Sequence, residues 1–411
     1  MRISRSAEII GDCIVKLFLD FFVLLCYVSI FFTTASIMFK FLVIISSFFI
    51  LIGTIISYKS IKKVITVGHI IQIAFFLWGI TSAFWAITTQ DVYDKSFTIL
   101  SMMIITYIIY IYYYNGILRG ESIKRVYNIF ILGGYVICYG ALAYWGPTEL
   151  IIKASIGERL YNDVLNPNTL GIIAINSIIL HFFYIIKLKL NSVSAIFMLP
   201  LIIIIAISGS RKVILLLAIA VMVGAFVMLK YLFTQKKVKL QQAVAVVLVL
   251  SAIIFAINNN MFSFVSTRLD GLWNIINGIN EADNSVIERA WMINLGFEIF
   301  QSNPLVGIGM DNAKNFVPFG FYLHNNFVEL LADLGVIGTM LFYCIYVWLL
   351  WSLYKLRNVK CVFTNITIFI IFANLFLDIA RVSYDAKELY FTFVAVFLLI
   401  DSLKLYEIKK I

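Results

Sequence analysis

The sequence is poor in charged residues, histidine and cysteine. Charged side chains make up 13% of the 411 residues, whereas a soluble domain averages about 25%. This scarcity excludes an ordinary soluble protein. The five cysteines form no CxxC pair and fall in no long predicted outer loop, so they indicate neither a disulfide framework nor a metal site. No small-residue cleavage site follows the first apolar stretch, which we expect to remain as a membrane anchor.

Long apolar runs are what the sequence has in abundance. Hydrophobic residues make up 62% of the chain. They form runs of about 20 residues, the length that a helix needs to cross a bilayer core of about 30 Å. We therefore predict an all-α polytopic membrane protein. Its expected twelve transmembrane helices lie at 17–37, 41–57, 64–87, 96–114, 126–145, 168–186, 193–209, 213–230, 241–257, 325–354, 362–380 and 389–403.

The lysines and arginines predict how these helices are oriented. If both termini lie in the cytoplasm, every inner segment carries at least two basic residues, and cytoplasmic loops are rich in Lys and Arg. The net charge of +10 is spread over many short loops and forms no patch, so it predicts no binding of nucleic acid.

One long outer loop divides the chain. We expect an N-terminal membrane bundle of about nine spans at 1–257, the loop at 258–324, and a C-terminal bundle of about three spans at 325–411. Loops of this length are usually functional or disordered, and this one holds aromatic residues and a helix pattern, so we expect it to fold.

A helix is predicted within that loop, at 285–303. Ser285 and Glu288 have the spacing of a capping box. One apolar stripe runs along this helix, through Val286, Ala290, Ile293, Phe297 and Phe300. We expect the helix to lie along the outer membrane face or on the outer ends of the spans. Arg289 lies near the helix N-terminus, where a helix favours anions.

Other polar residues near predicted span ends have both a structural and a functional reading. Arg211, in the turn "SGSRK" at 208–212, can be an interfacial anchor, but an outer position is the less usual side for an arginine. His324 can be a hydrogen-bonded surface group or a base near neutral pH. Asn166 and Asn168 flank Pro167 where a span begins, and a plain helix start with Asn168 as its cap is the favoured reading. The G-x-G in "LVGIGMDN" is expected to be a turn.

Four motifs in order resemble one superfamily, the bacterial O-antigen and capsule polymerases (Wzy) and O-antigen ligases (WaaL). They are "NPNTLG" at 166–171, "SGSRKVIL" at 208–215, "ERAWMINLGFEIFQSNPLVGIG" at 288–309 and "HNNFVELLADLGVIG" at 324–338. The last matches the pattern H-N-x9-G-x2-G through His324, Asn325, Gly335 and Gly338. The resemblance covers about residues 160–345.

The resemblance implies a GT-C-like, inverting glycosyltransferase that uses no metal ion, nucleotide sugar or other cofactor. Its donor would be a glycan on undecaprenyl pyrophosphate, at the outer face of the bacterial cytoplasmic (inner) membrane. Arg211 and Arg289 would bind the pyrophosphate, whose oxygens suit arginine forks, and His324 would deprotonate or orient the acceptor hydroxyl. Weaker candidates for substrate contacts are Arg268, Lys212, Asn325, Asn326, Asn166, Asn168 and Lys314.

Three activities remain open at this point. A polymerase is favoured by "NPNTLG" and by the compact sequence before "HNN", and this pathway implies a chain-length regulator as a possible partner beside the lipid bilayer. A ligase would transfer the same donor to lipid A–core. A lipid-linked oligosaccharide flippase is the third reading, but the sequence shows no internal repeat and few ionisable residues deep in its spans.

Overall fold

The computed structural model describes residues 2–34, 36–58, 62, 65–156, 166–188, 192–235, 284–359 and 361–408. Over these residues the chain is helical and contains no strand. Eight of the described helices are long and apolar enough to cross a membrane, and three shorter apolar helices accompany them. The predicted class, an all-α polytopic membrane protein, is confirmed in this part of the chain.

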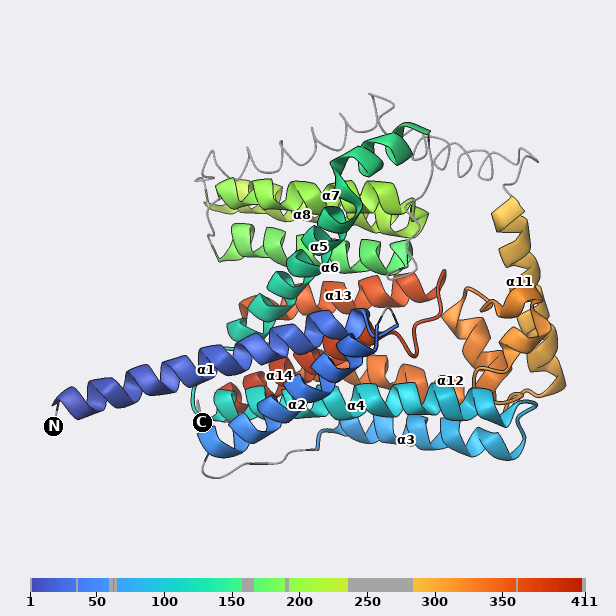
Figure 1. Cartoon of the computed structure of the whole chain (residues 1–411), viewed down its shortest axis with the longest axis horizontal. Helices are drawn as coiled ribbons and strands as arrows, with labels where there is room; N and C mark the ends of the chain where they lie inside the picture. The colour runs from blue at the N-terminus through green and yellow to red at the C-terminus, as the bar shows by residue number, and fades with distance from the viewer. Residues whose placement is uncertain are drawn as a thin grey trace. The chain divides into compact units, whose positions relative to one another are not determined.

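The described helices agree with the predicted spans. Eleven of the twelve predicted spans overlap an apolar helix, and the ninth, 241–257, lies outside the described residues. The α-helices (Figure 1) are α1 (Arg2–Phe31), α2 (Ile37–Ser57), α3 (Val67–Thr81), α4 (Thr89–Leu118), α5 (Lys124–Ile156), α6 (Pro167–Lys187), α7 (Leu199–Ser208), α8 (Arg211–Gln235), α11 (Asn284–Ser302), α12 (Asn326–Lys355), α13 (Val362–Asp378) and α14 (Lys387–Ile408). Short 3-10 turns are η1 (Ser82–Phe84), η2 (Ser192–Met198), η3 (Ala313–Phe316) and η4 (Pro318–Gly320).

The helix ends follow local sequence, with one correction. α6 begins at Pro167, and the side chain of Asn166 accepts a hydrogen bond from the Asn168 N–H. The cap is therefore Asn166 and not Asn168 as predicted, because proline favours the first helical position and places the cap one residue before it. α5 changes direction at Gly146, where the predicted span ends, but the chain continues as a helix to Ile156.

The chain divides into two compact units. Unit 1 comprises 1–23, 45–126 and 283–411, and unit 2 comprises 24–44 and 127–282. Within unit 1, α3 packs on α4 and α12, α4 packs on α14, and α11 packs on α12. Within unit 2, α6 packs on α7 and α8. The predicted division into two membrane bundles and a loop stays a prediction.

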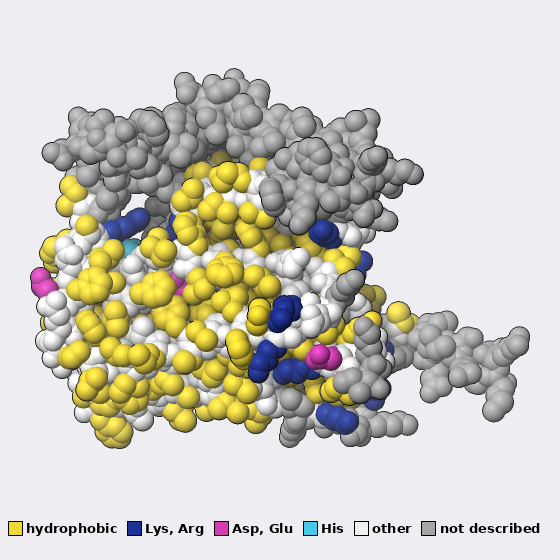
Figure 2. Space-filling view, turned by 180° about the vertical axis from the view of Figure 1, so that it is seen from behind, with side chains coloured by type: hydrophobic (Ala, Val, Ile, Leu, Met, Phe, Trp, Pro, Cys, Tyr) yellow, Lys and Arg dark blue, Asp and Glu magenta, His cyan; other side chains and the backbone are white. Residues whose placement is uncertain are grey.

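The described surface is largely apolar. Figure 2 shows hydrophobic side chains over most of the described part of the visible face. Large side chains such as Phe97, Met340 and Val347 are more than half exposed on helices. Exposed apolar side chains in such numbers are typical of a surface that lipid covers.

Polar contacts in unit 1 gather near both ends of α4. Near its end, Arg125 forms an ion pair of 2.9 Å with Asp20, which also accepts hydrogen bonds from Tyr112 and Tyr113. Near its start, Lys95 joins a second network, which belongs to the candidate site.

Candidate functional site

A loop from α11 to α12, residues 303–325, lies against the N-terminal part of α12. α12 is interrupted at Gly335, and the loop backbone pairs with the helix on either side of this break. The N–H of Ile308 donates to the carbonyl of Ala332 at 3.0 Å, and the N–H of Gly309 donates to the carbonyl of Asp333 at 2.8 Å. Beyond the break, the N–H of Val336 donates to the carbonyl of Pro304 at 2.9 Å. The loop is thus bound to the helix by main-chain hydrogen bonds.

Two glycines make this close approach possible. Gly335 has φ 63°, and a Cβ there would lie 2.6 Å from the backbone nitrogen of Val306. Gly307 has φ 70°, and its Cβ would lie 2.5 Å from the backbone nitrogen of Leu334. Only glycine combines this left-handed backbone with such contact. The backbone of Gly335 therefore explains the first glycine of H-N-x9-G-x2-G. The stretch 305–312 is a non-helical loop with turn residues at 305–306 and 310–311, on either side of "GIG".

The carboxylate of Asp333 organises the next part of the loop. Its oxygens accept the backbone N–H groups of Asp311 at 2.8 Å, Asn312 at 3.1 Å and Ala313 at 2.7 Å. Asp333 is completely buried. Successive backbone N–H groups form a concave donor site for an anion, and here the chain fills that site with its own carboxylate.

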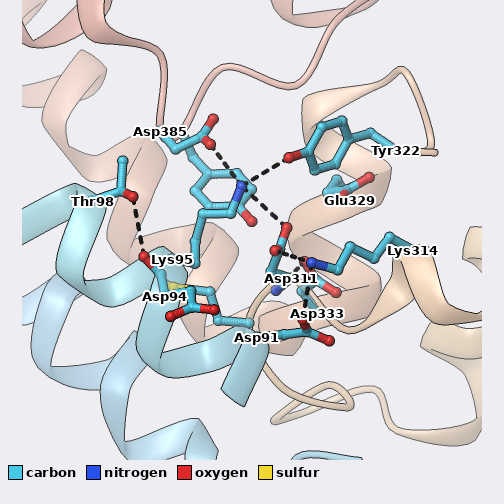
Figure 3. A network of polar contacts seen from close by, with 12 residues as sticks. Asp91, Asp94, Lys95, Thr98, Asp311, Lys314, Tyr322, Glu329, Asp333 and Asp385 are labelled. Atoms are coloured by element: carbon cyan, nitrogen blue, oxygen red, sulfur yellow. Dashed lines mark hydrogen bonds and ion pairs between the residues drawn. The ribbon is translucent and has the colours of Figure 1, made fainter. Parts of the chain in front are cut away.

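A buried ammonium joins this loop to two other segments (Figure 3). Lys95, on α4, is only 7% exposed, and its Nζ lies 2.7 Å from a carboxylate oxygen of Asp385 and 3.1 Å from one of Asp311. The same ammonium donates a hydrogen bond to the hydroxyl of Tyr322 at 3.2 Å. It also lies over the Tyr322 ring, 4.8 Å from its centre. Asp385 belongs to the segment between α13 and α14, so this one charge on α4 contacts two distant segments of unit 1.

Lys314, a predicted substrate contact, is paired with carboxylates. Its Nζ lies 2.7 Å from Asp311 and 3.1 Å from Asp91. Burial alone would lower the pKa of Lys314, but the hydrogen bonds and negative charges of Asp311 and Asp91 outweigh it and raise the pKa above its usual value. A phosphate would have to compete with two carboxylates for this ammonium.

His324 lies at the end of the loop, directly before α12, and is partly exposed. Its backbone is left-handed, with φ 59°, a conformation that costs a non-glycine residue about 1–2 kcal/mol. The residues on either side are fixed. The N–H of Leu323 donates to the carboxylate of Glu329 at 2.8 Å. The side chain of Asn325 caps α12 by accepting the N–H groups of Phe327 and Val328.

Asn326 connects the start of α12 to the α13–α14 segment. It is fully buried, and its side-chain oxygen accepts the N–H groups of Ser383 at 2.8 Å and Tyr384 at 3.0 Å. Its amide donates to the hydroxyl of Tyr343 at 2.9 Å. These bonds give Asn326 a structural role, while its predicted contact with substrate stays a prediction.

α11 carries Arg289 on its surface. The helix predicted at 285–303 is confirmed within one residue at each end, and Arg289 is exposed. Of the predicted apolar stripe, Ala290 and Phe297 are exposed, and Ile293 packs against a buried cluster. The buried face runs instead through Met292 and Ile299, because Gly296 between them lets Val328 and Leu323 of the loop and α12 approach the helix closely.

Two of the motifs meet in unit 2. A Cβ on Gly171, in "NPNTLG", would lie 3.0 Å from the hydroxyl of Ser208, in "SGSRK". Gly209 is left-handed, with φ 59°, and α8 begins at Arg211. Lys212 on α8 is partly buried. Arg268 lies outside the described residues.

The other two motifs meet in unit 1, where the loop after α11 pairs with α12. The four motifs therefore form two spatial pairs, one in each unit.

Sequence reasoning missed the residues that hold the loop in place, namely Lys95, Asp311, Tyr322, Asp333 and Asp385. The sequence did contain a signal for some of them, because an ionisable residue in an apolar segment is energetically costly and therefore indicates a structural or functional role. Asp333 falls within a predicted span, and Lys95 directly precedes one. Among the described residues, no three His, Cys, Asp or Glu side chains are arranged to hold a metal ion.

The described part is that of a polytopic helical membrane protein whose marked motifs pack against one another at helix ends. Residues 193–343 match the family model described as O-antigen ligase (Wzy_C). This segment includes the turn at Arg211, α11 and the complete H-N-x9-G-x2-G motif. The match supports membership of the chain in the Wzy/WaaL superfamily. No curated protein matches the chain significantly in sequence.

Proposed function

We propose that the protein is a membrane glycosyltransferase that polymerises undecaprenyl-pyrophosphate-linked oligosaccharide units into O-antigen or capsular polysaccharide. The observation that carries this proposal is the match of residues 193–343 to the O-antigen ligase family. The matched segment contains Arg211, Arg289 and His324, the three residues to which the resemblance gives the main roles.

The proposed reaction assigns one task to each kind of residue. The acceptor hydroxyl attacks the anomeric carbon of the donor sugar, the bond from that carbon to the pyrophosphate oxygen breaks, and the configuration inverts. His324 takes or orients the proton of the attacking hydroxyl. Arg211 and Arg289 stabilise the negative charge that grows on the leaving pyrophosphate. The partial exposure of His324 beside a fixed backbone supports its role.

We further propose that the site faces the outside and that both termini lie in the cytoplasm. The predicted topology puts the segments around residues 88–95, 303–325 and 379–388 on the outer side. In unit 1, Lys95, Asp311 and Asp385 from these segments form one network, which supports that the three segments share one side of the membrane. A chain-length regulator remains a proposed partner.

The second candidate is an O-antigen ligase that transfers the same glycan to lipid A–core, and the description of the matching family favours it. We keep the polymerase first because of "NPNTLG" and the compact loop before His324. A flippase remains the third reading, and the family match supports it least.

The test uses purified protein with one synthetic undecaprenyl-pyrophosphate repeat unit, with and without EDTA. A ladder of longer glycans that persists in EDTA is expected from the wild type. His324→Asn is a sharper variant than alanine, because asparagine tolerates the left-handed backbone but cannot act as the base. Asp94→Asn changes an exposed carboxylate and serves as a control. A single transfer product that appears only after lipid A–core is added would make the protein a ligase. No transfer to either acceptor would refute the glycosyltransferase.

A further inference from the structure

Lys95 holds the segment that presents His324. The loop from Asp311 to Tyr322 bears two of its three polar contacts, and Tyr322 is two residues before His324. The third contact, Asp385, lies directly after Tyr384, whose N–H is bound by Asn326 at the other side of His324. The two sequence neighbourhoods that flank His324 are therefore joined through the α13–α14 segment and the Lys95 ammonium, whose contacts with Asp311, Tyr322 and Asp385 are drawn in Figure 3.

This arrangement matters because the left-handed backbone of His324 is energetically unfavourable for a residue other than glycine. A left-handed histidine is maintained only where its surroundings outweigh the cost. Leu323 is fixed by Glu329 and Asn325 by the helix it caps, and Tyr322 is the next side chain along the incoming chain. The hydroxyl of Tyr322 bonds to Lys95. A buried ion network is weak evidence for a gain in stability, since the cost of desolvating the charges offsets their attraction. The residues that the Lys95 network connects are therefore better evidence for what it does.

We propose that Lys95 is a positioning residue for His324, acting through the hydroxyl of Tyr322 and the carboxylates of Asp311 and Asp385. The contacts that hold the chain on either side of His324 all lie in unit 1. The consequence for catalysis rests on the proposed function.

The variants are chosen so that folding and positioning separate. Lys95→Met leaves the carboxylates of Asp311 and Asp385 without their shared cation and can fail to fold. Tyr322→Phe removes only one hydroxyl and keeps the ring and both ion pairs. Tyr110→Phe is the matched control, because it also removes one hydroxyl that is bonded in unit 1, here to Asp401 of α14.

The first measurement does not need enzyme activity. The chain has three histidines, so protein with isotope-labelled histidine gives three imidazole signals by NMR, and His324→Asn identifies the one from His324. Tyr322→Phe is expected to shift or broaden that signal while the signals of His69 and His181 stay unchanged. Tyr110→Phe should leave the His324 signal in place. A His324 signal that is the same in Tyr322→Phe and the wild type would overturn the proposal.

The second measurement is a double-mutant cycle on glycosyl transfer. Tyr322→Phe is expected to lower kcat roughly ten- to a hundredfold, as a displaced catalytic group does, with little change in KM. The same change should cost nothing further in a His324→Asn background, because there is no base left to misplace. Equal losses in both backgrounds would mean a role that is independent of His324 and would also overturn the proposal. A shifted signal with unaltered kcat would leave the positioning intact and remove His324 from the proposed function.

Discussion

Replacing Asp333 by asparagine tests how the α11–α12 loop is held. The wild-type carboxylate accepts three backbone N–H groups, two at one oxygen and that of Asp311 at the other. Asparagine can keep the first oxygen but presents an amide N–H₂ group to the Asp311 N–H, so two donors face each other. A hydrogen bond to a charged group is worth about 1.5–3 kcal/mol, and we expect the local free energy of opening to fall by about 2–3 kcal/mol.

Hydrogen exchange of the peptide 309–317, followed by mass spectrometry in detergent, measures this directly. A loss of about 2–3 kcal/mol corresponds to exchange that is faster by about 30- to 150-fold, since about 1.4 kcal/mol is tenfold. Asp94→Asn is the matched control, because Asp94 is exposed and, among the bonds described, its carboxylate accepts only from the side chain of Gln90. Its exchange in the same peptide should equal that of the wild type.

The substitution of Asp333 also has an effect that opposes the loss of the hydrogen bond. Asparagine also removes the repulsion between the carboxylates of Asp333 and Asp311. These two residues are close, since the backbone N–H of Asp311 donates to the Asp333 carboxylate. If relief of repulsion outweighs the lost bond, the peptide will exchange as slowly as in the wild type or more slowly. That result would refute the view that the three N–H bonds hold the loop.

The remaining predictions concern a close contact, a cap and the arginines. Gly335→Ala should destabilise the protein by about 3 kcal/mol or more, from its positive φ and its contact with the 305–306 backbone, whereas Gly140→Ala, which meets nothing within 4 Å, should be nearly neutral in thermal unfolding. Asn325→Ala should cost about 1 kcal/mol and Asn325→Asp much less; equal costs would show that the cap does not matter. Arg211→Ala and Arg289→Ala should each abolish the glycan ladder, and lysine at either position should restore little of it, because an ammonium lacks the guanidinium fork; full activity of the lysine variants would show that charge alone suffices.

The spans could be predicted because the membrane allows few alternatives. Backbone groups in lipid must bond within the segment, so a long apolar run becomes a helix whatever its neighbours are. Capping chemistry was similarly local, and the error at Asn166 came from weighing Asn168 as a cap without the proline between them. The break of α12 at Gly335 could not be read from the sequence, because it depends on the backbone of Leu305 and Val306 lying against it.

The face of α11 and the Lys95 network required the tertiary structure. Apolar periodicity gave the α11 helix correctly but did not mark the face that packs against Leu323 and Val328, since a glycine at position 296 carries no weight in such a pattern and yet permits close packing. Lys95 contacts residues 227 and 290 positions away along the chain. No local pattern encodes such pairs, and the sequence alone could mark the lysine only as a costly charge beside a span.

The H-N-x9-G-x2-G motif can now be understood as one structural unit with a regular spacing. Asn325, Glu329 and Asp333 follow one another at intervals of four residues, which places them on one face of α12. Each of them binds backbone N–H groups: Asn325 those of the helix itself, Glu329 that of Leu323, and Asp333 those of residues 311–313. The same face ends at Gly335, where the helix admits the loop backbone. The nine residues between the asparagine and the glycine therefore set how the loop returns along α12 to His324, and the histidine owes its left-handed, partly exposed place to that path.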